Sequence, residues 1–389
     1  MYNIRTYNAI SSKGLSLFSA DKYLVSSESA SPEGVLLRSQ KLHKEVLPES
    51  VIAVARAGAG TNNIPTEDYT EQGIVVFNTP GANANAVKEL IVAGLLLGSR
   101  DIYGGMTYVQ ELGHMDDSGE MGKLLEKEKK RFAGSEITGK TLGVVGLGAI
   151  GSIIANLALD LGMNVIGYDP AISVEAAWQL SSRVERMESI EGLLASADFV
   201  TLHVPAIPAT KHLINKETLA QMKPTAKILN FAREEIVNTD DMVAALDAGT
   251  IAAYISDFPA PALLGRKDVL LMPHIGASTE EAEENCAAMA AKQLMDYLEN
   301  GNIHNSVNYP ATKMSRNGDY RITFTNNNVP KVLGTVLTVL ADAELNVVDM
   351  VNKSRDAIAY NIIDVEGDLD QSTEDAIAAI SGVIRVRVI

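Results

Sequence analysis

One hexapeptide, residues 146–151 (GLGAIG), constrains the fold of this chain more than any other feature. The apolar run 141–145 before it predicts a strand, and the pattern of residues 149–161 after it predicts a helix. A glycine-rich turn in that context is typical of a dinucleotide-binding βαβ unit when an acidic residue ends the next strand. Asp169 directly follows the predicted strand 164–168. The sequence therefore predicts a cofactor site here and not merely a flexible turn.

The residues of this motif have distinct expected roles. Gly146 permits a tight turn, Gly148 lets the backbone approach a pyrophosphate, and Gly151 lets the helix pack closely on the strand. The N-terminus of the helix offers N–H donors and a positive dipole to that anion. Asp169 is expected to accept hydrogen bonds from the adenosine ribose and to repel a 2′-phosphate, which favours NAD over NADP.

Short apolar runs alternate with helical patterns along most of the chain, which predicts an α/β fold with a doubly wound parallel sheet. The other predicted strands are 34–38, 51–56, 74–79, 199–202, 227–230, 251–255 and 269–272, and the clearest other helices are 85–97 and 279–299. Residues 113–135 are highly charged. We expect them to form either an exposed, mobile segment or a helix that lies on a partner.

Residues 318–389 have a different pattern. Strands are predicted at 321–324, 346–350, 357–364 and 383–388, with helices at 330–343 and 374–380. The order βαββαβ predicts a ferredoxin-like domain of about 70 residues.

Composition narrows the functional classes. A chain of 389 residues suggests two or three domains. No apolar run reaches the roughly 18 residues of a membrane span, and the N-terminus does not resemble a signal peptide. Cys286 is the single cysteine, which favours the reducing cytoplasm. A net charge of −16 disfavours nucleic acid as a partner, so an anionic substrate needs a local cluster of Lys and Arg. No metal site is expected.

Five further segments carry a resemblance. They are 55–63 (ARAGAGTNN), 203–210 (HVPAIPAT), 230–233 (NFAR), 256–259 (SDFP) and 273–279 (PHIGAST). In this order and spacing they resemble the D-2-hydroxyacid dehydrogenase family over roughly residues 34–310. The resemblance implies a Rossmann NAD-binding domain, 93–280, inserted in a flavodoxin-like substrate domain, 1–92 and 281–310. The segment 318–389 then resembles the amino-acid-binding ACT type of regulatory domain.

The chemistry of this family suits the residues in these segments. Oxidation of a 2-hydroxy acid needs a base for the hydroxyl proton while hydride leaves C2, and an imidazole exchanges protons near neutral pH. His274 stands where family members place that base. A fixed cation must hold the substrate carboxylate, and the planar fork of Arg233 can do so bidentately. Asp257 is the favoured candidate to orient His274. The alternatives are Glu234, the glutamates at 280, 281, 283 and 284, and a backbone or water partner.

The resemblance also implies a set of residues at the cofactor. These are Gly146, Gly148, Ala149, Ile150, Gly151, Asp169, His203, Val204, Pro205, Thr210, Phe231, Ala232, Arg233, Asp257, His274 and Gly276.

A phosphate on the substrate would need further cations. Arg38 with Ser39 matches the position where the phosphoglycerate-oxidising members of the family hold phosphate. Arg56 and Asn83 are plausible companions, and backbone N–H groups at residues 57–60, including Ala57 and Gly58, would share the carboxylate. Lys129, Lys130 and Arg131 could reach over from a neighbouring subunit, since this family dimerises through the cofactor domain. The chain is expected to form a homodimer or homotetramer. The alternative for each of these side chains is a solvated surface position.

The C-terminal module favours 3-phosphoglycerate as the substrate, because such a module characterises the serine-pathway members of the family. Asn326, Asn328 and Asn346 fall where that domain type binds an amino-acid effector at a subunit interface. The alternative is a domain that only dimerises.

The chain departs from the family pattern in three places, and two other functions compete. Ala260 stands where a glutamate usually orients the histidine, Glu234 replaces a glycine, and Lys331 replaces a glycine in the effector loop. The first departure bears on how the base is oriented, and the last on inhibition by serine.

The competing functions are a glyoxylate or hydroxypyruvate reductase and an NAD-sensing binding protein without catalysis.

Overall fold

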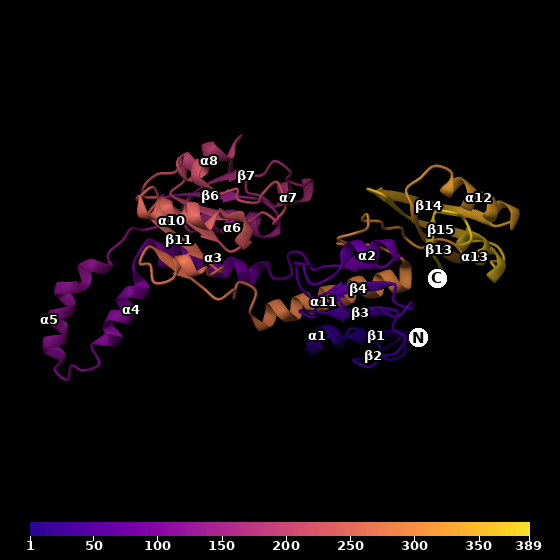
Figure 1. The fold of residues 1–389 in the computed structure, drawn as a ribbon, viewed down its shortest axis with the longest axis horizontal. Coiled ribbons are helices and arrows are strands. Elements are labelled where there is room, and N and C mark those ends of the chain that lie inside the picture. The colour runs from indigo at the N-terminus through magenta and orange to yellow at the C-terminus, as the bar shows by residue number, and fades with distance from the viewer. The chain divides into compact units, whose positions relative to one another are not determined.

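The computed structural model describes residues 1–389, with the side chain of Glu175 left out. The chain divides into two compact units, 84–278 and 1–83 with 279–389. Each unit is built on a parallel sheet, and the second also carries an antiparallel sheet. The predicted α/β fold with parallel sheets is therefore confirmed (Figure 1).

Unit 84–278 has a seven-stranded sheet of order β12-β11-β10-β9-β6-β7-β8, and every pair in it is parallel. Numbered from β6, this is the Rossmann order 3-2-1-4-5-6 with a seventh strand added. The strands are β6 (Thr141–Val145), β7 (Asn164–Tyr168), β8 (Glu185–Arg186), β9 (Phe199–Leu202), β10 (Lys227–Asn230), β11 (Ala253–Ser256) and β12 (Val269–Leu271). The helices are α3 (Ala84–Ser99), α6 (Ala149–Asp160), α7 (Val174–Gln179), α8 (Ile190–Ser196), α9 (Lys216–Leu219) and α10 (Thr239–Asp247), with short 3₁₀ turns η2 (Glu234–Ile236) and η3 (Pro261–Leu263).

The central strands of this sheet are buried along most of their length because both faces of the sheet are covered. Along β10, Ile228 packs in the core with α8 and α10, whereas the next residue, Leu229, packs in the core with α3 and α6. In β11, Tyr254 likewise packs in the core with α8 and α10, and Ile255 packs in the core with α3 and α6. Continuous apolar runs therefore indicated these strands correctly.

A helical hairpin extends away from this sheet (Figure 1). It consists of α4 (Ile102–Glu111), α5 (Ser118–Glu128) and the 3₁₀ turn η1 (Lys129–Phe132). None of the described residues of these three elements is buried. The charged segment is thus largely helical and exposed, while α4 was not predicted from the sequence.

The other unit contains a parallel sheet of order β2-β1-β3-β4-β5, which is the flavodoxin-like order. Its strands are β1 (Tyr2–Thr6), β2 (Tyr23–Ser26), β3 (Gly34–Leu37), β4 (Ala53–Arg56) and β5 (Val75–Phe77), and its helices are α1 (Ser12–Leu15), α2 (Thr66–Glu71) and α11 (Glu280–Asn300). The long helix α11 packs against α1, β3 and β4. It begins at the N-cap Thr279 and ends at Gly301, whose φ of 69° gives the left-handed C-cap.

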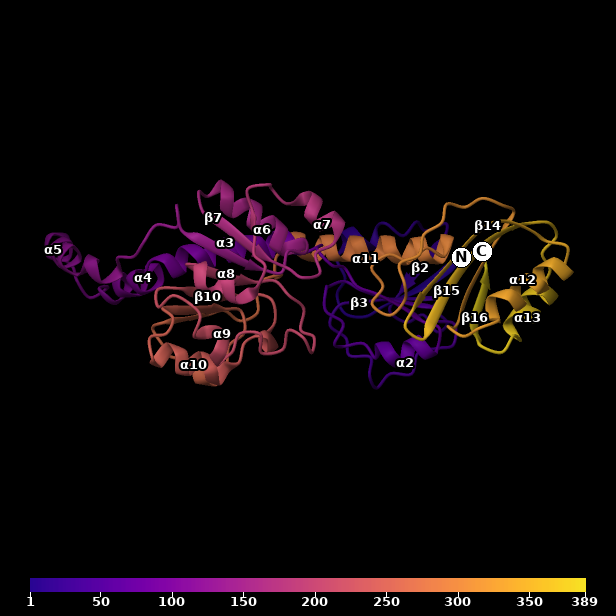
Figure 2. The same ribbon diagram turned by 90° about the horizontal axis from the view of Figure 1, so that it is seen from above.

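The C-terminal segment of this unit folds as an antiparallel sheet of order β14-β15-β13-β16 with α12 and α13 on one face (Figure 2). Its elements are β13 (Tyr320–Asn327), α12 (Val332–Asp342), β14 (Asn346–Arg355), β15 (Ile358–Glu366), α13 (Gln371–Ala378) and β16 (Val383–Val388). This is the βαββαβ topology of a ferredoxin-like domain. The opposite face of β15 packs through Tyr360 and Ile362 against Tyr297 of α11.

The described residues contain neither a membrane-spanning helix nor a cluster of metal ligands. No helix among them is both long enough and apolar enough to cross a membrane. No three of their His, Cys, Asp and Glu side chains are grouped so that they could hold a metal ion.

Candidate active site

The predicted cofactor and catalytic residues of unit 84–278 follow six neighbouring strands at one edge of the sheet. Because all these strands are parallel, their carboxyl ends meet at that edge, and the order of the chain reverses between β6 and β9. Such a switch point is where open α/β sheets bind their ligands. The residues are Asp169 after β7, Gly146 after β6, His203 after β9, Arg233 after β10, Asp257 after β11 and His274 after β12.

The three glycines of the turn meet three different environments. Gly146 has a φ of 90°, and a Cβ there would lie 2.6 Å from the carbonyl oxygen of His203. A Cβ on Gly151 would lie 1.9 Å from the carbonyl oxygen of Gly146, which is how α6 packs so closely on the turn. A Cβ on Gly148 would meet no described atom within 4 Å. The turn thus needs two glycines for its own packing, whereas Gly148 leaves open space in front of the helix.

The start of α6 and Asp169 fit an adenine dinucleotide. Gly148 is the N-cap of α6, and no described side chain caps the first amides of that helix. These amides and the helix dipole are therefore available to a pyrophosphate. The Asp169 carboxylate accepts hydrogen bonds from the Leu147 amide (2.8 Å) and from the Ala171 amide (2.9 Å). It thereby fixes the turn and stands beside it as a partner for ribose hydroxyls.

The loop after β9 is held by its own side chains. Nε2 of His203 lies 2.9 Å from Oγ1 of Thr201, and burial lowers the pKa of His203 to about 3, so its imidazole is neutral. The Thr210 hydroxyl donates to the Pro205 carbonyl, and it accepts from the Ile207 amide at 3.0 Å. The hydroxyl of Thr210 thus closes the loop 205–210.

Asn230 is a positioning residue that the sequence prediction left out. It is fully buried at the end of β10, where its side-chain amide donates to the Arg233 carbonyl (2.9 Å) and its oxygen accepts from the Ala232 amide (3.2 Å). The backbone that presents Arg233 is therefore fixed from inside the sheet. A buried asparagine at the carboxyl end of an apolar strand is a signal that could have identified it. The Phe231 ring, in contrast, packs into the core against Gly94, so only its backbone can face a cofactor.

Asp257 supports the loop that carries His274. Its carboxylate is 1% exposed and accepts hydrogen bonds from the amides of Ile275 (2.8 Å) and Gly276 (2.7 Å). A Cβ on Gly276 would lie 3.0 Å from the same carboxylate, which explains the glycine. His274 itself is exposed, with a φ of 57°, and its ring lies 4.9 Å from that of Phe258. Asp257 therefore acts on the backbone beside the imidazole.

The departures Ala260 and Glu234 have different surroundings. Ala260 is partly buried and packs on the core of α8 and α10. Glu234 is exposed and opens η2.

The predicted substrate residues of the other unit lie at the carboxyl ends of β3 and β4. The Arg56 side chain folds back over Gly58 and donates to the carbonyls of Arg38 (2.9 Å) and Gly60. Ala57 is buried, and its amide donates to the Leu37 carbonyl (2.7 Å).

Two residues outside the predicted set hold the segment that begins at Arg38. The Arg38 guanidinium forms an ion pair with Glu283 of α11 (2.6 Å). The Asn8 side chain accepts from the Ser39 amide (3.0 Å). Neither contact had a signal in the local sequence, because Asn8 and Glu283 lie far from positions 38 and 39. Asn83, the last predicted substrate residue, is partly exposed directly before α3.

The three predicted effector asparagines do not gather in one chain. Asn326 and Asn346 pair with Ala359 and Glu366, which lie at opposite ends of β15. The side chain of Asn326 is buried and accepts from Asn361 (2.8 Å), whereas Asn328 donates to the Asp356 carbonyl (3.2 Å). Any effector site that uses both ends of the sheet thus needs a second copy.

Two other predicted features can also be placed. Lys331 keeps a left-handed φ of 79° at the N-cap of α12. In the hairpin, Lys129 pairs with Glu126 (2.5 Å) and Arg131 with Glu128 (2.9 Å), and both cations are exposed, as is Lys130.

Comparison with known proteins gives concordant matches. Residues 105–276 match the family described as D-isomer specific 2-hydroxyacid dehydrogenase, NAD binding domain. A D-3-phosphoglycerate dehydrogenase of Synechocystis is 38% identical over 72% of this chain, but the chain spans only 49% of that relative. One of Haemophilus influenzae is 32% identical over 87% of this chain and 81% of its own length. A structure of NAD⁺-bound 3-phosphoglycerate dehydrogenase from Entamoeba histolytica is 26% identical, with a TM-score of 0.61 over 79% of this chain and 98% of that one.

Proposed function

Because the chain belongs to the D-isomer specific 2-hydroxyacid dehydrogenase family, we propose that it oxidises D-3-phosphoglycerate to 3-phosphohydroxypyruvate with NAD, for L-serine biosynthesis. The relatives that carry this name support the substrate. The single cysteine, buried Cys286, fits a cytoplasmic location for this enzyme.

The observation that carries this proposal is the shared carboxyl edge of the sheet, which joins the glycine turn and Asp169 to Arg233 and His274. Bound NAD supplies the hydride acceptor. Arg233 holds the substrate carboxylate and balances the charge that develops on the C2 oxygen. His274 takes the hydroxyl proton in oxidation and returns it in reduction. Asp257 and Asn230 position these two residues through the backbone.

The proposal is tested by following NADH oxidation with 3-phosphohydroxypyruvate, glyoxylate and hydroxypyruvate in parallel. We expect far higher kcat/KM for the phosphorylated acid. Arg233→Ala should abolish most turnover while leaving NADH affinity nearly intact, because the cofactor is held by the glycine turn and Asp169. Comparable rates on all three acids would contradict the phosphorylated substrate. Tight NADH binding without turnover of any acid would instead indicate an NAD-sensing binding protein.

A glyoxylate or hydroxypyruvate reductase is a second candidate, and one observation favours it. The Arg38 guanidinium already pairs with Glu283, and Arg56 already donates to two carbonyls. Both cations expected to receive a phosphate are thus engaged. A phosphorylated acid would have to break these contacts, whereas an unphosphorylated acid would leave them in place. The same three-substrate assay separates the two candidates.

The domains are proposed to divide the work. Residues 1–92 and 281–310 form the substrate domain, 93–280 the NAD-binding domain, and 318–389 an ACT-type domain for an amino-acid effector. The ferredoxin-like topology of β13–β16 supports the last assignment. Asn326, Asn328 and Asn346 would contribute to an effector site between two copies, since one chain holds them at opposite ends of the sheet.

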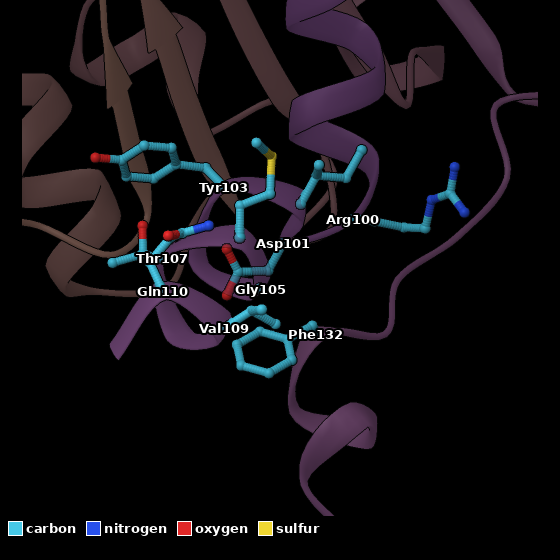
Figure 3. A pocket seen from close by; sticks show the side chains of 10 residues that line it. Arg100, Asp101, Tyr103, Gly105, Thr107, Val109, Gln110 and Phe132 are labelled. Atoms are coloured by element: carbon cyan, nitrogen blue, oxygen red, sulfur yellow. The ribbon is translucent and has the colours of Figure 1, made fainter. Parts of the chain in front are cut away.

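The enzyme is also proposed to be a homo-oligomer that pairs through the α4–α5 hairpin. Figure 3 shows side chains that line a hollow along α4, among them Tyr103, Val109 and Phe132. Tyr103 and Met106 are 65% and 64% exposed. Helices of 10 and 11 residues are marginal in water without packing, so a second copy would cover this apolar face.

A further inference from the structure

Arg38 and Glu283 form an ion pair between segments that lie far apart in the sequence. Arg38 directly follows β3, and Glu283 lies in the first turn of α11. Nη1 of Arg38 is 2.6 Å from Oε1 of Glu283, and the two side chains are 38% and 45% exposed. The pair is therefore open to solvent, so an anion arriving from water can reach it.

Of the two cations expected to receive a phosphate, Arg38 pairs with a carboxylate through its guanidinium. Arg56 is already engaged, because its guanidinium donates to the carbonyls of Arg38 and Gly60. Behind the pair, the Cys286 thiol is buried and has a raised pKa, chiefly because of burial, so it stays neutral. The negative charge that competes for Arg38 is thus that of Glu283.

We propose that Glu283 is a specificity-determining residue, whose carboxylate competes with the distal anionic group of the substrate for Arg38. This inference rests on the proposed function, in which Arg38 receives the phosphate. A phosphate carries more charge than a carboxylate, so it can displace Glu283 from Arg38. Its binding is weakened, however, because the ion pair must break and because the freed carboxylate repels the phosphate. A neutral hydroxyl at the same position has no such competition. Glu283 therefore reduces the difference in KM between phosphorylated and unphosphorylated acids.

Neighbouring acidic residues provide a matched control. Glu281 and Glu283 both stand in the first turn of α11, where the helix dipole favours a negative charge. Glu284 is engaged by Lys13 at 2.8 Å. Glu281→Gln therefore removes the same charge from the same turn but leaves the partner of Arg38 in place.

The test compares the wild type with Glu283→Gln, Glu281→Gln and Arg38→Ala. For Glu283→Gln we expect KM for 3-phosphohydroxypyruvate to fall about five- to tenfold, the size of one solvent-screened charge interaction at close range. The constant for competitive inhibition by inorganic phosphate should fall in parallel, and KM for hydroxypyruvate should hardly change. Glu281→Gln should behave like the wild type, and raised ionic strength should shrink the effect of Glu283→Gln.

The outcomes separate this inference from the proposed function. If Arg38→Ala weakens phosphate inhibition and raises KM for the phosphorylated acid, Arg38 is the phosphate site. Glu283→Gln must then lower KM for the phosphorylated acid and the inhibition constant of phosphate. If both constants equal those of the wild type, Glu283 does not compete for Arg38. An equal fall of both constants in Glu281→Gln also overturns the proposed competition. The effect would then come from the total negative charge of the first turn of α11 and not from the contact with Arg38. If Arg38→Ala changes neither constant, the assignment of phosphate to Arg38 fails, and the inference fails with it.

Discussion

At the residue scale, Asp257 shows how a buried charge can serve a neighbouring loop. Its two oxygens accept from the amides of Ile275 and Gly276, next to His274. Asparagine has the same shape but offers one acceptor and one donor, so one amide would face an N–H group. A hydrogen bond to a charged group contributes about 1.5–3 kcal/mol. The loop that carries His274 should therefore loosen in Asp257→Asn.

We expect Asp257→Asn to lower kcat/KM by about tenfold or more, the kinetic equivalent of one such bond. NADH affinity should change little, since Asp169 and the glycine turn remain. Steady-state kinetics and NADH titration measure the two effects, with the exposed Asp240→Asn as the control. A loss that fell entirely on NADH affinity would show that Asp257 serves the cofactor instead.

His203 predicts a dependence of stability on pH. Burial lowers its pKa to about 3, against 6.5 for the ordinary side chain. Between these values the unfolded chain binds a proton that the folded chain does not, so stability falls as pH drops from about 6.5 towards 3. The slope from one such group is at most about 1.4 kcal/mol per pH unit.

Urea unfolding of the wild type and His203→Gln at pH 7 and pH 5 checks this expectation. The variant should lose less stability between the two pH values than the wild type does. His43→Gln removes an exposed histidine and should follow the wild type. Parallel losses in all three proteins would mean that His203 is not buried neutral.

At the scale of elements, the C-terminus of α11 is held by the ferredoxin-like segment. The last carbonyls of a helix have no partner within it. Here the Asn300 carbonyl accepts from Arg321 (2.9 Å), the Gly301 carbonyl from Tyr360 (2.7 Å), and the Leu298 carbonyl from Arg387 (2.9 Å). Arg321 is also locked to Asp364 by two hydrogen bonds of 2.6 and 2.7 Å, with both side chains fully buried. The helix and the C-terminal sheet therefore depend on each other for stability.

Arg321→Leu should destabilise the protein by about 3–5 kcal/mol, because it leaves the Asp364 carboxylate buried without its partner. The double variant Arg321→Leu/Asp364→Leu should recover only part of this loss, since the Asn300 carbonyl still lacks its donor. Chemical denaturation measures both variants. Full recovery in the double variant would show that capping of α11 by Arg321 contributes nothing.

At the scale of the whole molecule, the α4–α5 hairpin bears on assembly. Met106→Glu places a charge among the residues that line the hollow along α4. We expect this variant to be monomeric, or to dissociate at a much higher protein concentration than the wild type, when molar mass is measured by light scattering. Glu111→Gln, on the same helix, should leave the mass unchanged. A wild type that is already monomeric would contradict pairing through the hairpin.

The sequence alone determined those parts of the protein whose signals are local. The glycine turn, Asp169 and six of the seven strands of the large sheet could be predicted because turn geometry and apolar runs are set by neighbouring residues. Strand β8 was missed, since it is two charged, exposed residues long. The ferredoxin-like order of the last 70 or so residues followed from the same periodicities. Strands β1 and β2 were missed, since β1 has a single fully buried position and β2 is short and partly exposed.

Tertiary structure alone decided which side chains meet across long stretches of chain. The pairing of Arg38 with Glu283, the use of Asp257 by the loop after β12, and the locking of Arg321 to Asp364 join residues that share no local pattern. It also placed Asn346 at the far end of the sheet from Asn326. Such contacts depend on strand order, register and helix packing, which bring together residues that periodicity treats as unrelated. That is why the sequence could name candidate residues but could not say which partner each of them holds.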